Sequence, residues 1–268
     1  MSEMDREGTY EALAGCYDAM TEDVDYPAWA DFLEKLFARE KRQVRTVLDL
    51  ACGTGTMTCL LTRRGYEMIG VDFSPEMLAV AAEKARETEG TPPIFLCQAM
   101  DRLDLYGTVD ACVCLLDSVN HVTRRSVLLR ALHRVWLFLE PGGLFVFDIH
   151  TPEHLQALDG GMFLDENDDA YCVWRTDYDP RRRICTYAMD VFRREGETWL
   201  RDGEVHEEFA YTPEEIEEAL TRTGFVQIRR YGNRKLRKPL PGEDRIFFTA
   251  RKPLEGKDGR REEHGFDR

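Results

Sequence analysis

Short runs of apolar residues recur along the first 150 residues, and longer amphipathic stretches separate them. Each short run is bounded by polar residues or glycine and predicts a buried strand, whereas the amphipathic stretches predict helices. The strands expected here are residues 46–50, 67–71, 94–98, 109–116 and 144–149. The helices expected are residues 7–20, 26–40, 56–61, 75–86 and 124–139. Strands of nearly continuous apolar character that alternate with helices are typical of a parallel sheet covered on both faces.

The pattern changes after residue 150, where polar and apolar residues alternate. Such alternation predicts antiparallel strands with one face in solvent, here at residues 170–178, 184–193 and 199–211. Turn-forming pairs of residues separate these strands, so we expect a small antiparallel insertion over the mouth of the main sheet. The remaining elements expected are a helix at 213–222 and strands at 225–231 and 245–252.

These elements predict an α/β fold of the Rossmann-like type. We expect a seven-stranded, mostly parallel sheet with helices on both faces, an N-terminal helical lid and a small antiparallel β insertion. The divisions expected are a helical cap at 1–43, a Rossmann-like domain at 44–150 and 213–252, the insertion at 151–212 as a lid over the ligand, and a disordered tail at 253–268.

The overall charge narrows the choice of partners. The formal net charge is -14, and so acidic a chain repels phosphate backbones. Nucleic acid is therefore not expected as a partner. The N-terminus has no apolar leader, and no apolar run is long enough to cross a bilayer, so a cytoplasmic protein without a membrane segment is expected.

The cysteines and histidines do not form a metal-binding pattern. His150 and His154 have helical spacing, but no cysteine or histidine cluster accompanies them, so no metal site is expected. Several cysteines lie within or beside apolar runs and are expected as small buried hydrophobes in a reducing compartment. They are Cys52, Cys97, Cys112, Cys114 and Cys185.

A glycine-containing segment, residues 49–55, lies between the first sheet strand and its helix. Gly53 and Gly55 let the backbone turn tightly and approach a ligand closely. Open α/β sheets bind ligands at this edge, beyond the carboxyl ends of the strands. A dinucleotide-binding loop would have a third glycine where this chain has Thr58, so a dehydrogenase is disfavoured.

Side chains at the ends of the next strands fit an adenosine. Asp72 can accept hydrogen bonds from both hydroxyls of a ribose, and Phe73 can lie against an adenine face. After the third strand, Asp101 can accept from the adenine amine and Met100 can cover the ring. Leu116 ends the fourth strand on the same edge of the sheet. Acidic groups suit a cationic ligand and would repel a pyrophosphate.

This arrangement resembles the class I S-adenosylmethionine (SAM)-dependent methyltransferases, over roughly residues 44–149 and 225–252. The resemblance implies that SAM is the cofactor, with its methionine part on residues 49–55, its ribose on Asp72 and its adenine on Asp101. Ala51 stands where this family often has a glycine. The cofactor-binding residues expected are Tyr17, Trp29, Asp49, Ala51, Gly53, Thr54, Gly55, Asp72, Phe73, Met77, Met100, Asp101 and Leu116.

Within this class, residues 17–20, 25–29 and 204–208 resemble the YqeM-like bacterial small-molecule methyltransferases. The expected reaction is methyl transfer to a nitrogen or oxygen atom of a small molecule. The transfer is a direct displacement, in which alignment supplies most of the acceleration and a hydroxyl acceptor needs a base. His121 and His206 are the candidate catalytic residues, and Tyr26, Glu208 and Tyr211 are the candidate substrate residues.

Other interpretations stay open at this point. Tyr17, Tyr26 and Trp29 could be core aromatics, His121 could be a structural histidine, and the 206–211 stretch could be a solvated strand face. The protein could bind SAM without turnover, or methylate RNA or protein. The acceptor and the oligomeric state are not encoded in any pattern of this sequence.

Overall fold

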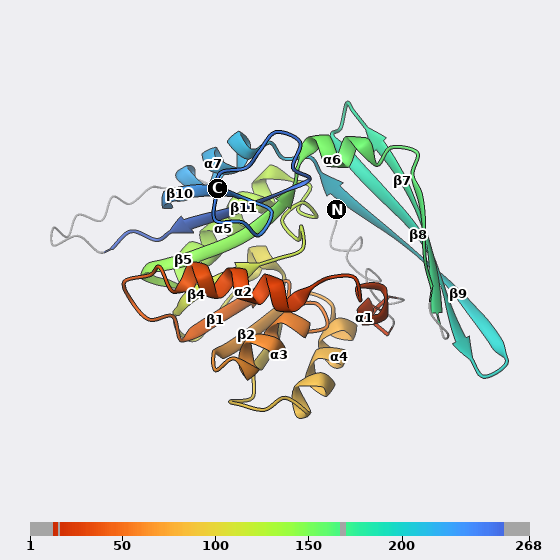
Figure 1. Cartoon of the computed structure of the whole chain (residues 1–268), viewed down its shortest axis with the longest axis horizontal. Helices are drawn as coiled ribbons and strands as arrows, with labels where there is room; N and C mark the ends of the chain where they lie inside the picture. The colour runs from red at the N-terminus through yellow and green to blue at the C-terminus, as the bar shows by residue number, and fades with distance from the viewer. Residues whose placement is uncertain (1–12, 16, 167–169, 255–268) are drawn as a thin grey trace.

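The structure is a computed structural model that describes residues 13–15, 17–166 and 170–254. Its centre is a seven-stranded sheet in the order β10-β11-β5-β4-β1-β2-β3 (Figure 1). These strands are β1 Thr46–Leu50, β2 Glu67–Asp72, β3 Ile94–Cys97, β4 Val109–Cys114, β5 Leu139–His150, β10 Val226–Gly232 and β11 Arg245–Arg251. β1 to β5 pair in parallel, and β11 runs antiparallel to both β5 and β10. The predicted fold class is confirmed.

Helices cover both faces of this sheet because its strands are apolar on both sides. On β4, Ala111 faces the core that contains α2 and α3, and its neighbour Cys112 faces the core that contains α5 and α7. The helices are α1 Tyr17–Met20, α2 Tyr26–Phe37, α3 Thr56–Arg63, α4 Pro75–Arg86, α5 Arg125–Phe138, α6 Pro152–Ala157 and α7 Pro213–Arg222, with a short 3₁₀ helix, η2, at Met100–Arg102.

The described N-terminal elements differ from the prediction. Of the helix expected at 7–20, residues 13–15 form a turn and α1 begins at Tyr17, while residues 7–12 and 16 lie outside the described residues. α2 ends at Phe37 instead of residue 40, because residues 39–43 offer no apolar side chain to bury. Residues 255–268 of the expected tail also lie outside the described part of the chain.

The insertion is a second sheet, sheet B, with strand order β6-β7-β8-β9. Its strands are β6 Met162–Glu166, β7 Ala170–Asp179, β8 Ile184–Glu195 and β9 Thr198–Phe209. α6 and β6 were not predicted. Every residue of β6 is exposed, including Met162, Phe163 and Leu164, so the strand lacks the alternation that reveals a buried face. Figure 1 shows sheet B projecting beyond the main sheet, with α1 between the two.

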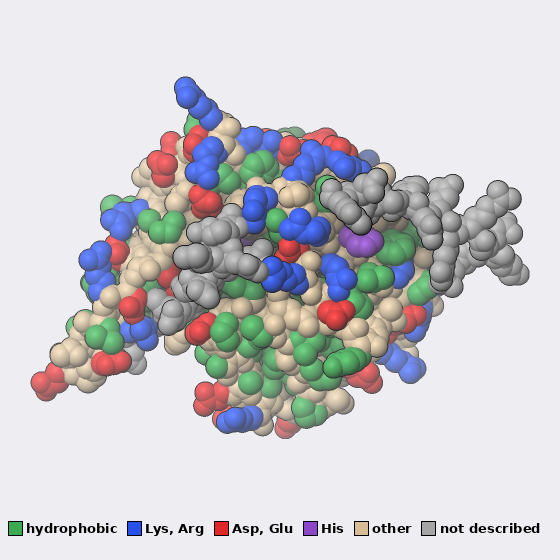
Figure 2. All heavy atoms as spheres, turned by 180° about the vertical axis from the view of Figure 1, so that it is seen from behind, with side chains coloured by type: hydrophobic (Ala, Val, Ile, Leu, Met, Phe, Trp, Pro, Cys, Tyr) green, Lys and Arg blue, Asp and Glu red, His purple; other side chains and the backbone are tan. Residues whose placement is uncertain are grey.

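The next observations concern the charged surface, the membrane and the cysteines. The face seen in Figure 2 carries both basic (Lys, Arg) and acidic (Asp, Glu) side chains. No helix in the described part of the chain is long and apolar enough to span a membrane. The seven described cysteines are free thiols, and most are buried. Cys97 was wrongly predicted as buried; it is exposed because β3 is the edge strand of the sheet.

Candidate active site

A cavity of about 340 Å³ lies where the carboxyl ends of the parallel strands face sheet B. The main sheet contributes Gly53 and Asp72 on one side and Arg245 on another, while sheet B contributes His206 and Glu208. A smaller cavity of about 50 Å³ adjoins it and shares lining residues with it, such as Tyr17 and Gly53. The glycine-containing loop therefore lies between the two spaces.

Asp72 is fixed at the end of β2 by backbone donors. The N–H groups of Gly53 and Ser74 each donate to one of its carboxylate oxygens at 2.9 Å. Ser74 also caps α4 by accepting from the N–H of Met77. Burial raises the pKa of Asp72. Each oxygen keeps a lone pair, so the carboxylate can accept from a ligand hydroxyl in the cavity.

The two glycines of the loop differ in what surrounds them. Both have a positive φ, +53° at Gly53 and +71° at Gly55. A Cβ on Gly53 would meet no atom within 4 Å, because this residue borders the cavity. A Cβ on Gly55 would lie 2.9 Å from the Cβ of Ala81. Gly55, predicted as a cofactor contact, therefore lies against α4 and does not line the cavity.

Asp49 lies below the loop, buried at the end of β1. The hydroxyl of Thr58 donates to its carboxylate at 2.5 Å. Burial raises the pKa of Asp49 to about 6, and the nearby Asp72 contributes to the rise. Asp49 and Ala51 both line the smaller cavity, and Ala51 has a positive φ of 60°.

The short helix α1 is tied to the loop through Asp18. One carboxylate oxygen accepts from Thr54 at 2.5 Å and from Thr56 at 3.1 Å, and the other lies 2.6 Å from the ammonium of Lys84. This places Tyr17 beside both cavities, where burial raises the pKa of its hydroxyl. These contacts hold the N-terminal segment, which here means residues 13–15 and 17–20, over the glycine-containing loop.

The predicted adenine-binding residues divide into two groups. Phe73, Met77 and Met100 line the larger cavity, as does Gln98, which was not predicted. Asp101 lies outside the residues that line it, and its carboxylate is 2.9 Å from the guanidinium of Arg130. The sequence placed Asp101 at the correct strand end, but η2 turns it toward α5.

The far end of the cavity contains a buried charged network. Arg245 lies 2.7 Å from Asp117 and 2.6 Å from Nε2 of His150, and it also contacts the fully buried Asp148. The Nδ1 atom of His150 is 3.0 Å from Glu208. In neutral His150, Nε2 accepts from Arg245, a permanent donor, and the N–H at Nδ1 donates to Glu208. Burial favours this neutral form, but Asp117 and Glu208 raise the pKa of His150 above its usual value and favour the protonated ring.

Asp117 is held in an uncommon backbone conformation. Leu116 and Asp117 have positive φ values of 56° and 51°, although neither is glycine. The N–H of Asp117 donates to Asp148 at 3.0 Å, which holds this turn. Burial would raise the pKa of Asp117, but His150 and Arg245 hold it well below its usual range. Asp117 is therefore an anion that faces the cavity.

The two predicted catalytic histidines lie side by side, with ring centroids 6.0 Å apart. His206 is buried, and its Nε2 lies 2.8 Å from Glu204. Burial lowers the pKa of His206, despite the opposing effect of Glu204. Nε2 of His121 is 3.9 Å from Asp117. Both histidines line the larger cavity.

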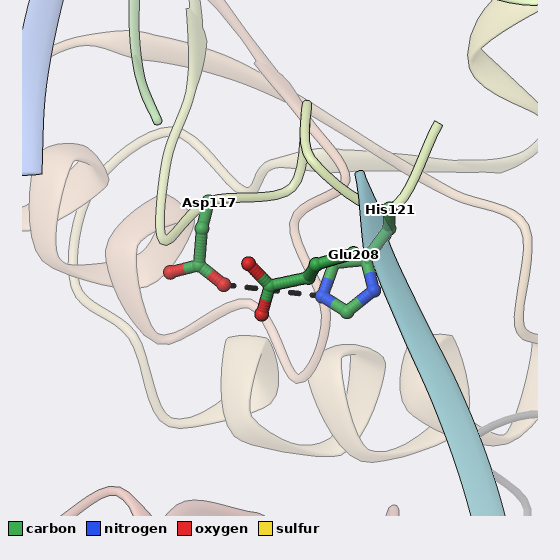
Figure 3. Close-up of side chains that lie close together, drawn as sticks. All are labelled: Asp117, His121 and Glu208. Atoms are coloured by element: carbon green, nitrogen blue, oxygen red, sulfur yellow. Dashed lines mark ion pairs between the residues drawn. The ribbon is translucent and has the colours of Figure 1, made fainter. Parts of the chain in front are cut away.

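Asp117, His121 and Glu208 point toward one another (Figure 3), and their ligand atoms lie within 4.8 Å of one another. Such a set could hold a metal ion. However, Asp117 already pairs with Arg245 and Glu208 with His150. With one guanidinium against two carboxylates, this place keeps a single net negative charge, which suits a monocation better than a divalent metal ion.

Three aromatic residues that were predicted to bind cofactor or substrate do not line the larger cavity. Tyr26 and Trp29 line the smaller cavity, and Trp29 packs on Phe247 with ring centroids 5.2 Å apart. Tyr211 lies outside the residues that line either cavity, and its hydroxyl donates to the carbonyl of Val122 at 2.5 Å. The strand β9 ends at Phe209, before Tyr211, so Tyr211 does not share the face that carries His206 and Glu208.

Sequence reasoning missed several residues of the far end: His150, Tyr187, Met189, Trp174 and Arg245. The sequence contained one signal of this part of the site: the polar residues Asp148 and His150 interrupt the otherwise apolar end of β5. Arg245 had no such signal, since it enters the site through its pairing with His150 across β5 and β11.

Comparison with known proteins gives a consistent result. A family model described as a methyltransferase domain matches residues 47–143. The chain is 29% identical over 245 residues to YqeM of Bacillus subtilis, a candidate methyltransferase, covering 91% of this chain and 97% of YqeM. A solved S-adenosylmethionine-dependent methyltransferase from Clostridium acetobutylicum is 30% identical, with a TM-score of 0.81 over 92% of this chain and 99% of that one. The sugar N-methyltransferase KedS8 from Streptoalloteichus shares 21% identity and a TM-score of 0.72 over 87% of this chain and 90% of its own, which is a likeness of fold.

Proposed function

Because the chain belongs to the S-adenosylmethionine-dependent methyltransferase family, we propose that it methylates a nitrogen atom of a small molecule bound in the larger cavity. SAM is the cofactor of this family and supplies an electrophilic methyl group on a sulfonium. The observation that carries the choice of acceptor is a pair of carboxylates, the half-buried Asp117 and the buried Glu208, at the end of the cavity away from Asp72.

The residues around the loop fit SAM. Asp72 offers acceptors for the ribose hydroxyls, and Gly53 leaves open space where a side chain would intrude. Phe73 and Met100 offer apolar surfaces for the adenine, and Asp49 offers negative charge near the methionine part. We propose these contacts as the cofactor site, with Tyr17 and Trp29 closing over it. Gly55 and Asp101 support it from outside.

The opposite end suits a small amine. Most amines are cationic in neutral water, and the Asp117 and Glu208 carboxylates would attract and orient such a group. KedS8 is a sugar N-methyltransferase, so its methyl acceptor is nitrogen, which supports the same choice here. Tyr26 borders the smaller cavity and is a weaker candidate for contact with the acceptor.

An amine must lose a proton before its lone pair can attack. A basic side chain first takes the proton of the ammonium group. The nitrogen lone pair then forms a bond to the methyl carbon as the carbon–sulfur bond of the sulfonium breaks, which releases S-adenosylhomocysteine. We propose that His206, or its neighbour His121, accepts that proton. The walls of the cavity align the nitrogen behind the methyl carbon and exclude water, which supplies most of the acceleration.

The division of the chain follows from these roles. We propose that residues 44–150 and 213–252 form the SAM-binding domain and that residues 1–43 form its cap. Residues 151–212 form the substrate lid, because His206 and Glu208 reach the cavity from sheet B. A role in RNA methylation is less supported, since the net charge is -14. SAM binding without turnover would leave the charged far end of the cavity unexplained.

The test is methyl transfer to matched acceptors. The protein is incubated with SAM and pairs of small amines and their hydroxyl counterparts, and S-adenosylhomocysteine and methylated product are quantified. We expect product from amines, and at least tenfold less with Glu208→Gln or Asp117→Asn, while SAM affinity is kept. Glu207→Gln is the matched control, because Glu207 pairs with Arg182 on the solvent face of β9. Product from hydroxyl compounds alone would replace nitrogen by oxygen as the acceptor. SAM binding with no product from any compound would favour the binding role.

A further inference from the structure

Glu204 links the candidate base to the N-terminal segment. It lies on β9 two residues before His206, so both side chains leave the same face of the strand. One carboxylate oxygen is 2.8 Å from Nε2 of His206. The other oxygen accepts the backbone N–H of Leu13 at 3.0 Å. All three residues are buried.

The contact with Glu204 determines which nitrogen of His206 carries the proton. An ionised carboxylate can only accept hydrogen bonds, so Nε2 of a neutral His206 must be the protonated nitrogen. Nδ1 is then the nitrogen with a lone pair. In this tautomer the lone pair on Nδ1 can take a proton from an amine, whereas the other tautomer has its lone pair directed at Glu204.

Other ionisable groups also face His206. His121 lies on the segment after β4, Glu208 lies on the same face of β9, and Tyr187 pairs with His206 across β8 and β9. His121 opposes a positive charge on His206 and Glu208 favours one. Glu204 lies within hydrogen-bond distance of Nε2.

Leu13 belongs to the segment that covers the cavity. Its side chain packs with Met77 of α4 and Met189 of β8, and it lines the cavity. A few residues later, Asp18 ties the same segment to the glycine-containing loop. Docking of this segment therefore bridges the main sheet and sheet B, and it places a backbone donor on Glu204.

We propose that Glu204 is a positioning residue that fixes the tautomer of His206, and that the N–H of Leu13 holds Glu204 in place. The proton acceptor is then complete only when the N-terminal segment is docked over the cavity. This inference rests on the proposed methyl transfer for its effect on rate. Its structural part, the tautomer of His206, can be measured without any acceptor.

The first measurement is nitrogen-15 NMR of the histidine rings in the full chain, with SAM present. The chain has six histidines, and His206→Gln identifies the signal of residue 206. We expect His206 to be protonated at Nε2 in the parent protein. In Glu204→Gln the two tautomers should mix, because an amide can donate as well as accept. A parent His206 protonated at Nδ1 would overturn the proposal, whatever the activity.

The second measurement is the pH profile of kcat/KM with any amine that is methylated. We expect Glu204→Gln to lower kcat by on the order of a hundredfold and to shift the profile, while the affinity for SAM stays unchanged. Glu204→Asp should recover part of the loss, and Glu207→Gln should resemble the parent protein. An unchanged profile in Glu204→Gln would overturn the role of Glu204.

A third comparison isolates the backbone donor. Leu13→Pro removes the N–H and Leu13→Ala keeps it, and both lose the leucine side chain. We expect the NMR signal of His206 to change as in Glu204→Gln in the proline variant and to stay near the parent value in the alanine variant. Equal spectra for the two variants would overturn the role of Leu13.

Discussion

The hydroxyl of Thr58 donates a 2.5 Å hydrogen bond to the carboxylate of Asp49. Thr58 occupies the position at which a dinucleotide-binding loop has its third glycine. In this chain the position holds a side chain that secures a buried acid under the loop. The same residue that disfavoured a dinucleotide in the sequence thus has a positive role in the fold.

Asp49 should make stability depend on pH. Its pKa is about 6 in the folded protein, above its value in an unfolded chain of about 3.9. The folded state therefore binds more protons between these values, and the free energy of unfolding falls as the pH rises from about 4 to 6. Asp49→Asn keeps an oxygen for Thr58 and removes the charge.

We expect the asparagine variant to gain on the order of 1–3 kcal/mol relative to the parent protein between pH 4 and 7. Urea denaturation of the SAM-free proteins across this range measures the difference. If the free energies of unfolding of the two proteins change in parallel with pH, Asp49 does not cause the pH dependence of stability.

Removal of the Asp72 carboxylate should weaken SAM binding. Asp72→Ala loses the acceptor for the ribose and the bonds that hold Gly53 and Ser74. We expect the Kd for SAM to rise tenfold or more, which is about 1.4 kcal/mol. Calorimetric titration with SAM and S-adenosylhomocysteine measures it, and the melting temperature of each protein controls for folding. An unchanged Kd would remove Asp72 from the cofactor site.

The two glycines of the loop should respond differently to alanine. Both substitutions strain a left-handed residue by about 1–2 kcal/mol. Gly55→Ala also forces a contact of 2.9 Å with Ala81, so we expect it to be the less stable variant. Gly53→Ala places its methyl group in open cavity space, so we expect it to be the weaker SAM binder. Thermal melts and titrations of both proteins test this crossed pattern, and the same ranking in both assays would contradict it.

Tyr211 should matter for stability and not for substrate binding. Its hydroxyl bonds to the carbonyl of Val122 outside the cavity. Tyr211→Phe should therefore cost about 1 kcal/mol of stability and leave KM for an acceptor unchanged. Chemical denaturation and steady-state kinetics measure the two effects. A large rise in KM without loss of stability would return Tyr211 to the substrate site.

Methyl transfer should persist in the presence of EDTA. The positive charge beside Asp117 comes from Arg245, which lies 2.7 Å from it. We expect chelation to change the rate of methyl transfer by less than about twofold. Addition of Mg²⁺, Mn²⁺ or Zn²⁺ should likewise have little effect on the rate. Loss of activity on chelation and recovery with one metal would instead assign that metal to Asp117, His121 and Glu208.

The cofactor half of the site was largely predictable because its signals are local. Asp72 is the last residue of β2 and Gly53 lies shortly after β1, and the ends of parallel strands meet at one edge of the sheet. Asp101 satisfied the same rule, yet η2 directs it to Arg130, which no local pattern encodes. The roles of these side chains toward SAM stay predictions.

The acceptor half was harder to predict because distant segments form it. Arg245 reaches Asp117 only after β11 has paired with β5, and Glu208 reaches His150 only after sheet B has folded over the main sheet. The alternation of β9 correctly grouped His206 with Glu208 on one face. The strand was expected to run to Tyr211, but it ends at Phe209.

The pairing of β5 with β11 also bears on how the chain is made in the cell. β5 pairs with β4 on one side, and its other edge stays unpaired until residues 245–251 have been synthesised. At about 5–20 residues per second, the roughly one hundred residues between them take several seconds to synthesise. During that time a strand that contains Phe145, Phe147 and Ile149 has an open edge, which is a template for pairing with another chain. Truncation before residue 245 should therefore produce aggregated protein instead of a soluble core, and a ribosome-bound chaperone would find its target at β5.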